Sequence, residues 1–227
     1  MRVFYPLLLI NFKTYIEALG DRGLNLAKIA EKISLEYGVC IAVAPQFVDI
    51  KMIAEEVSIP IFAQHIDPYM PGAYTGHITP ESIKEAGAHG TLLNHSERRL
   101  RVDEIELSLN RCKELNLICC ICAGNTPIAI SLSMLNPEMV AVEPPELIGS
   151  GISVSKAKPE IVKSSVEAIK RINPSVHVLC GAGISDDVDV RKAIELGSEG
   201  ILVASSIVKS KDPEKLLQKF AKAMLSS

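Results

Sequence analysis

Residues 138–144, EMVAVEP, contain four apolar residues in a row and then stop on a carboxylate. Short apolar runs of this length, rich in β-branched residues, are typical of strands that are buried on both faces. Similar runs recur along the chain as PLLLIN (6–11), VCIAVAP (39–45), IPIFAQ (59–64), GTLLN (90–94), LICCICAG (117–124), VHVLCGAG (176–183) and EGILVAS (199–205). The sequence therefore predicts eight buried strands.

Helical patterns separate most of these runs. Apolar residues recur at spacings of three and four, as in Leu24, Ala27, Ile29, Ala30 and Ile33, or in Ile161, Val162, Val166 and Ile169. Thr79 and Asp212 each precede a proline and a glutamate, which is typical of a helix start, and Gly87 and Gly197 follow helical patterns as helix ends.

Alternating buried strands and helices predict a parallel sheet covered by helices, because each parallel crossover needs a long connection. Eight such units indicate a closed (β/α)8 barrel, and we expect one domain over residues 1–227. An open, doubly wound sheet is the structural alternative. It is disfavoured because no GxGxxG motif follows the first apolar run and because eight units are many for an open sheet of this length.

Composition excludes several classes of protein. The chain has 48% hydrophobic and 22% charged residues, as ordinary globular proteins do, and its net charge of -3 does not favour nucleic acid as a partner. The apolar segment 3–10 is too short to span a membrane and lacks a cleavage pattern, so we expect a cytoplasmic protein with no membrane partner. The six cysteines fit a reducing compartment, and the CxxC pair Cys119 and Cys122 reads as part of a buried strand more than as a metal or redox site.

Polar residues follow three of the predicted strands. Asn11 and Lys13 follow the first, His95 follows the fourth, and Glu143 follows the sixth. In a barrel these strand ends converge on one mouth, so an amine, an imidazole and a carboxylate are expected to share a site. Each residue alone could instead be a solvated cation, a core histidine or a helix-capping acid.

Small residues follow the last three strands, as GSG (149–151), GAG (181–183) and ASS (204–206). Small side chains let backbone N–H groups approach an anion, and barrels commonly bind phosphate after strands seven and eight. A short helix starting at Ser205 could contribute its N-terminus. Glycines often serve only as turns, but three adjacent loops of this type favour a phosphate site.

With these motifs in order, the whole chain resembles the triosephosphate isomerase family in its short archaeal form. The motifs are NFKTY (11–15), AYTGHI (73–78), NHSERR (94–99), EPPELIGSG (143–151), CGAGI (180–184) and ILVASS (201–206). The resemblance implies a TIM barrel that interconverts dihydroxyacetone phosphate and glyceraldehyde 3-phosphate in glycolysis and gluconeogenesis, with no cofactor and no metal.

The resemblance also implies roles for individual residues. Glu143 would be the base and His95 a neutral electrophile. A short helix that Ser96 caps would disfavour the charged form of His95. Triosephosphate isomerase is itself the standard example of this pairing of a carboxylate with a neutral imidazole. Lys13 would stabilise developing negative charge, Asn11 would position it, and Glu97 would pair with it or take part in proton transfer. Substrate phosphate would be held at Ile148, Gly149, Gly183, Ala204 and Ser205, and residues 144–150 would close over the site.

Residues 67–76, DPYMPGAYTG, resemble the family's subunit-interface loop, with Thr75 and Tyr74 in contact with a second copy. The resemblance implies a homo-oligomer. It favours a tetramer, built as a dimer of dimers, over a simple dimer. Read alone, the segment could be an ordinary surface loop, but that would leave an apolar patch in water.

Two other functions fit part of this pattern. Another phosphosugar isomerase would share the small-residue loops but not the NFK, NHSE and EPPEL motifs together. A non-catalytic metabolite-binding barrel would tolerate the loss of the Glu143 carboxylate.

Overall fold

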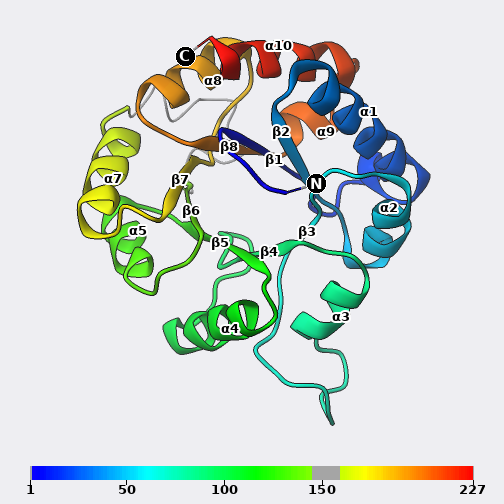
Figure 1. Ribbon diagram of the computed structural model, residues 1–227, viewed down its shortest axis with the longest axis vertical. Coiled ribbons are helices and arrows are strands. Elements are labelled where there is room, and N and C mark those ends of the chain that lie inside the picture. The colour runs from blue at the N-terminus through cyan, green and yellow to red at the C-terminus, as the bar shows by residue number, and fades with distance from the viewer. Residues whose placement is uncertain (1, 145–158, 227) are drawn as a thin grey trace.

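A computed structural model describes residues 2–144 and 159–226. Its strands are β1 (Leu7–Asn11), β2 (Cys40–Ala44), β3 (Phe62–Ala63), β4 (Gly90–Leu93), β5 (Ile118–Ala123), β6 (Met139–Val142), β7 (His177–Cys180) and β8 (Gly200–Val203). They form one parallel sheet in the order β2-β1-β8-β7-β6-β5-β4-β3. A parallel bridge between Val43 and Ile61 brings its two edges together, which confirms the predicted (β/α)8 barrel (Figure 1).

Helices surround this barrel in Figure 1. They are η1 (Ile16–Ala18), α1 (Asp21–Tyr37), η2 (Phe47–Asp49), α2 (Ile50–Glu56), α3 (Pro80–Glu85), α4 (Val102–Glu114), α5 (Thr126–Ser133), α7 (Pro159–Ile172), α8 (Asp187–Glu195), α9 (Ser205–Val208) and α10 (Pro213–Leu225). The predicted helix starts are confirmed, since Thr79 caps α3 and Asp212 caps α10, each with a proline in the first turn. The left-handed backbone of Gly87 and Gly197, with φ of 96° and 92°, follows α3 and α8 as predicted.

Two apolar layers explain why the strands read as unbroken hydrophobic runs. Alternate residues point into the barrel or outward onto the helices, and both sets are buried. The barrel interior holds Leu7, Leu9, Cys40, Ala42, Phe62, Leu92, Cys120, Cys122, Met139, Ala141, Leu179 and Leu202. The outer layer includes Leu8, Ile10, Ile41, Val43, Leu93, Cys119, Ile121, Val140 and Val142.

All six cysteines are buried and carry free thiols. Cys119 belongs to the outer apolar layer and Cys122 to the barrel interior, so the CxxC pair is part of strand β5, as the sequence predicts. Burial raises the pKa of the Cys180 thiol to about 12, which keeps the thiol protonated and unreactive. No helix in residues 2–144 or 159–226 combines the length and apolar character that a membrane crossing needs.

The barrel interior should carry a large share of the stability. Leu9→Ala removes a side chain that is 0% exposed in that layer, and we expect it to lower the free energy of unfolding by about 2–5 kcal/mol. The matched control Leu107→Ala, at a side chain that is 55% exposed, should change it by less than about 0.5 kcal/mol. Urea unfolding measures both values, and equal losses would contradict the assignment of the interior core.

Candidate active site

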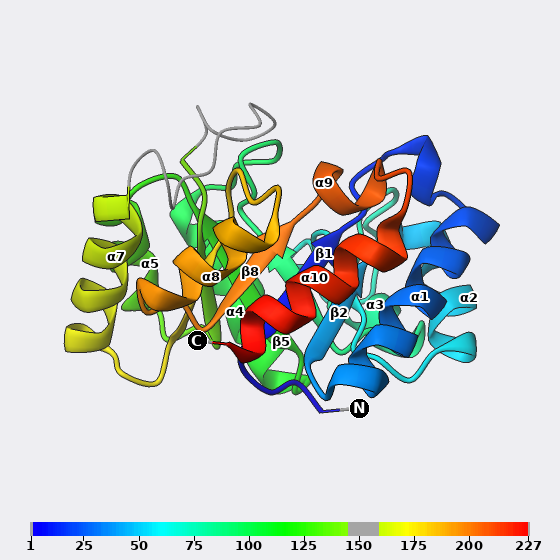
Figure 2. The same cartoon turned by 90° about the horizontal axis from the view of Figure 1, so that it is seen from above.

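The carboxyl ends of the strands lie at one end of the barrel. Figure 2 shows α9, which follows β8, at the end opposite the N-terminus. A cavity of about 250 Å³ opens there, lined by Asn11, Lys13, His95 and Glu143 together with the loops after β7 and β8. The structure therefore brings together the four polar residues that the sequence places at strand ends.

Glu143 directly follows β6, and its side chain continues the inward-pointing series of that strand. Its backbone N–H donates to the Ala123 carbonyl oxygen at 2.8 Å, which ties it to the end of β5. Only 3% of the residue is exposed, and Oε2 is buried with no hydrogen-bond partner within the described part of the chain. Gly181 lies beneath it, where an added Cβ would meet Glu143 Cγ at 2.4 Å, so the residue under the carboxylate has to be glycine.

Burial decides the basicity of Glu143. Loss of solvent raises the pKa of its carboxyl from 4.5 to about 7, against the opposing effects of a hydrogen bond from the Cys122 thiol and the charges of Lys13 and Arg99. A carboxylate with this pKa is a much better proton acceptor than one in water.

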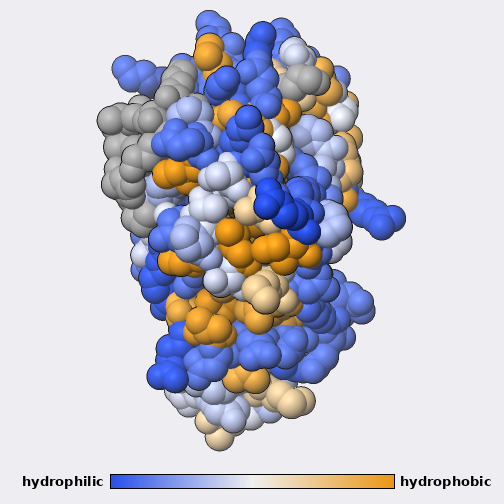
Figure 3. Space-filling model, turned by 90° about the vertical axis from the view of Figure 1, so that its left-hand side faces the viewer, coloured by the Kyte–Doolittle hydropathy of each residue, from blue (hydrophilic) through white to orange (hydrophobic). Residues whose placement is uncertain are grey.

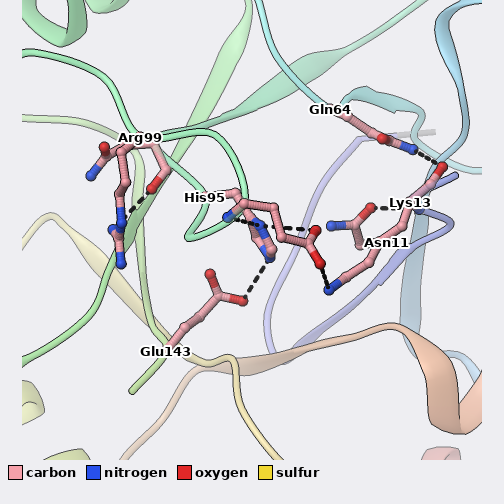
Figure 4. Close-up of polar contacts among 8 residues, drawn as sticks. Asn11, Lys13, Gln64, His95, Arg99 and Glu143 are labelled. Atoms are coloured by element: carbon pink, nitrogen blue, oxygen red, sulfur yellow. Dashed lines mark hydrogen bonds and ion pairs between the residues drawn. The ribbon is translucent and has the colours of Figure 1, made fainter. Parts of the chain in front are cut away.

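The His95 ring lies beside this carboxylate, with Nε2 3.6 Å from Glu143 Oε1 (Figure 4). The backbone N–H of Glu97 donates to Nδ1 at 3.2 Å, so Nδ1 is an acceptor and Nε2 carries the proton. Burial, followed by the nearby Lys13 ammonium, lowers the pKa of the imidazole to about 4. The ring is therefore neutral at pH 7 and presents an N–H donor toward Glu143 and the cavity.

The prediction of a short helix directly after His95 is wrong. Residues 96–98 form a turn, and α4 begins only at Val102. The Arg98 backbone N–H donates to the His95 carbonyl oxygen at 2.8 Å, which closes that turn. The imidazole is thus kept neutral by burial and by Lys13 rather than by a helix N-terminus.

Lys13 is held in a left-handed backbone conformation, with φ of 48°, that a lysine rarely adopts. Its backbone N–H donates to Asn11 Oδ1 at 2.9 Å, and its Nζ donates to Glu97 Oε1 at 2.8 Å. Gln64 Nε2 donates to the Lys13 carbonyl oxygen at 2.8 Å (Figure 4). It also donates to the Ala44 carbonyl oxygen at 3.0 Å. Sequence reasoning missed Gln64; the available signal was its place as the polar residue that ends the IPIFAQ run.

The other predicted site residues fall into three groups. Gly183, Ala204 and Ser205 line the same cavity as Glu143, after β7 and β8. Ile148 and Gly149, with the predicted closing loop beyond residue 144, lie outside the described residues. Tyr74 and Thr75 lie in the loop between β3 and α3, which extends away from the barrel in Figure 1.

Glu143, His95 and Lys13 together suit one kind of chemistry. A basic carboxylate next to a neutral N–H donor and a fixed cation can take a proton from a carbon beside a carbonyl while the negative charge collects on oxygen. Glycine and small residues after β7 and β8 leave room for an anion near backbone N–H groups. Within the described residues, no group of three His, Cys, Asp or Glu side chains is placed to hold a metal ion.

Comparisons with known proteins point to one family. A sequence model described as triosephosphate isomerase matches residues 6–222. A triosephosphate isomerase of Methanocaldococcus jannaschii is 53% identical over 216 residues, which is 95% of this chain and 99% of the relative. Those of Methanothermus fervidus and Archaeoglobus fulgidus are each 50% identical, over 96% and 92% of this chain and 99% and 94% of the relatives.

Glu143 should destabilise the folded chain at neutral and alkaline pH. Its carboxyl titrates near 4.5 in the unfolded chain and about 7 in the folded one, so between these values the folded state binds more protons and its stability falls as pH rises. Glu143→Gln, which is neutral throughout, should therefore be more stable than the wild type at pH 8, by at most about 3 kcal/mol. The difference should shrink toward pH 4.5.

Urea unfolding of both proteins at several pH values measures this difference. Glu106→Gln, at an exposed glutamate of α4, serves as the control and should track the wild type at every pH. A constant offset between Glu143→Gln and the wild type from pH 5 to pH 8 would show that the buried carboxyl does not titrate as described.

Proposed function

The chain belongs to the triosephosphate isomerase family, whose members interconvert dihydroxyacetone phosphate and glyceraldehyde 3-phosphate, and from this premise we propose that Glu143 is the base of the reaction and His95 its electrophile. The observation that carries this assignment is the 3.6 Å contact between His95 Nε2 and Glu143 Oε1 at the cavity. Both groups are buried; burial makes the Glu143 carboxylate a stronger base by raising its pKa, and it keeps the His95 imidazole neutral by lowering its pKa.

The proton route follows from these two states. Glu143 takes a proton from the carbon next to the carbonyl. The electron pair of that C–H bond forms a carbon–carbon double bond, and the π pair of the carbonyl moves onto its oxygen to give an enediolate. The neutral His95 imidazole donates its Nε2–H to that oxygen as its charge develops. The proton of the adjacent hydroxyl then moves to this oxygen, a transfer that His95 Nε2 can relay, and Glu143 gives its proton to the former carbonyl carbon. A new carbonyl forms at the carbon that first lost its proton, so the aldose and the ketose are exchanged with no net change in protons.

Lys13 supplies the fixed positive charge in this scheme. Its ammonium lies in a site from which water is largely excluded, since its side chain is only 11% exposed, so its attraction for the enediolate and the phosphate is weakly screened. We assign to Glu97 the role of holding this ammonium at 2.8 Å while its backbone N–H fixes the His95 tautomer. Asn11 holds the Lys13 backbone.

The phosphate is assigned to the loops after β7 and β8. Gly183 has a left-handed backbone with φ of 70°, and Ala204 and Ser205 lie at the start of α9, so their small side chains allow backbone N–H groups to reach an anion. Ile148 and Gly149 are proposed to complete this cradle from the segment after Glu143, which would close over the bound substrate and exclude water.

Coupled assays in both directions test the assignment with Glu143→Gln and His95→Gln. We expect each variant to lower kcat by about 100- to 10,000-fold, the usual contribution of a positioned acid or base. Each should still fold and bind a phosphate-bearing enediolate mimic, because the phosphate loops are unchanged. A folded Glu143→Gln protein with wild-type turnover would overturn the mechanism and favour the metabolite-binding alternative.

A second copy of the chain is the partner that we propose for the loop 67–78. Met70 and Tyr74 in this loop are 61% and 45% exposed, and Tyr74 stacks on Tyr69 with ring centroids 4.3 Å apart, so the loop presents an ordered apolar tip. A second cavity, of about 380 Å³, lies beside the site and is lined by Lys13, Phe47, Gln64, His65, His95 and Arg98. We propose that the tip of one copy enters this cavity of the other, with Thr75 next to Lys13 and His95.

We propose further that two such dimers form a tetramer. The face over α5 and α7 carries scattered apolar side chains (Figure 3), and Ile128, Met134 and Ile172 there are 40%, 70% and 50% exposed. We place the reaction in glycolysis and gluconeogenesis in the cytoplasm, where the six free cysteines would remain reduced.

Tyr74→Asp should disrupt the dimer, because it places a charge in an apolar contact, and it should lower kcat because each site would lose its neighbour's loop. Met134→Asp should instead yield active dimers. Sedimentation velocity and assays of the same samples measure both effects. A wild-type protein that sediments as a monomer at micromolar concentration while fully active would exclude the proposed interface.

A further inference from the structure

The turn between β4 and α4 carries both His95 and Glu97, so its geometry decides where the imidazole points. Asn94 begins this turn. It has a left-handed backbone with φ of 57°, and only 6% of the residue is exposed. Asparagine tolerates this conformation better than most residues, but a buried amide also needs hydrogen-bond partners.

The Asn94 side chain has a partner on each side. Its Nδ2 donates to the Cys122 carbonyl oxygen at 3.0 Å, and its Oδ1 accepts from the Leu100 backbone N–H at 3.0 Å. The first bond joins the turn to the end of β5, and the second joins the beginning of the turn to its end. Asn94 therefore closes the turn as a loop and attaches it to the barrel wall.

Arg99, which belongs to the same loop, also supports Asn94. Its Nη1 donates to the Asn94 carbonyl oxygen at 3.1 Å, and Figure 4 shows Arg99 on the opposite side of His95 from Lys13. The peptide between Asn94 and His95 is thus held by Arg99, while the side chain of Asn94 is held by β5 and Leu100. The His95 backbone has little freedom to rotate.

Strand β5 also holds Glu143. The Ala123 carbonyl oxygen accepts from the Glu143 N–H, and the carbonyl of the preceding residue, Cys122, accepts from Asn94. Two consecutive carbonyls at the end of β5 therefore hold Glu143 and the residue next to His95. Their spacing is set by one rigid element rather than by two independent loops.

We propose that Asn94 is a positioning residue, which holds the His95 imidazole in register with Glu143 through the end of β5. The proposal rests on the roles proposed for His95 and Glu143. Asn94 itself does not line the 250 Å³ cavity and is not assigned any contact with substrate. Its effect is on the orientation of the ring, so it should appear in kcat rather than in the binding of the phosphate.

Asn94→Gly isolates this role, because glycine keeps the left-handed backbone and removes both side-chain hydrogen bonds. We expect kcat to fall by about 10- to 100-fold, the effect of a small misplacement of a reacting group. KM should change by less than about threefold, because the phosphate is assigned to the loops after β7 and β8 and not to this turn. The matched control is Asn116→Gly, at an exposed asparagine with φ of 54° after α4, and it should keep wild-type kcat.

A second readout reports the ring directly. In ¹⁵N-histidine NMR spectra, His95 of the wild type should show one fixed tautomer, with the proton on Nε2, at pH 5.5–8. Asn94→Gly should shift these signals toward a mixture of tautomers, whereas a purely structural role would leave them unchanged. If Asn94→Gly does not fold, Asn94→Asp provides the same test, because it keeps the acceptor for Leu100 and loses the donor to Cys122.

The outcomes separate the two proposals. A folded Asn94→Gly protein with wild-type kcat and unchanged His95 signals would overturn the positioning role. If His95→Gln keeps full activity, the catalytic role of His95 fails, and the NMR signals of His95 in Asn94→Gly still decide whether Asn94 positions the ring.

Discussion

The burial of the Glu143 carboxylate is the constraint on which the rest of the site depends. A carboxyl group that is out of water becomes a stronger base, but its ionised form then lacks the solvation that water would supply. Lys13 and Arg99 provide part of the missing stabilisation, and Gly181 leaves the space that the side chain occupies. The neighbouring imidazole carries its proton on Nε2, and the same burial and the same lysine keep it neutral.

These groups are held by hydrogen bonds to strand ends more than by contacts with one another. Gln64 and Asn11 fix the backbone of Lys13, and the end of β5 fixes Glu143. Two residues of the site region, Lys13 and Asn94, have left-handed backbones that the surrounding bonds stabilise. Strained backbone of this kind persists only where the surrounding structure over-determines it, and both examples lie next to groups to which we assign chemistry.

The sequence alone predicts the barrel because every strand is buried on both faces and therefore reads as a short apolar run. It also predicts Lys13, His95 and Glu143 as a group, because parallel strands bring their carboxyl ends to one mouth. It does not predict the turn after His95, where Ser96 and Glu97 suggest a helix start but α4 begins only at Val102. Gln64 and Asn94 were missed for a related reason: each acts through hydrogen bonds to backbone far away in the sequence, and residue spacing carries no record of such bonds.

The burial of the cysteines limits how fast the folded protein reacts with oxidants and thiol reagents. All six thiols are buried, and several lie in the walls and interior of the barrel. A thiol reagent can reach those only after strands separate, so the rate of modification of the native protein is governed by how often the barrel opens. The rate at which these cysteines react therefore reports how often the barrel opens. A chain that opens rarely tolerates oxidising conditions despite its six cysteines.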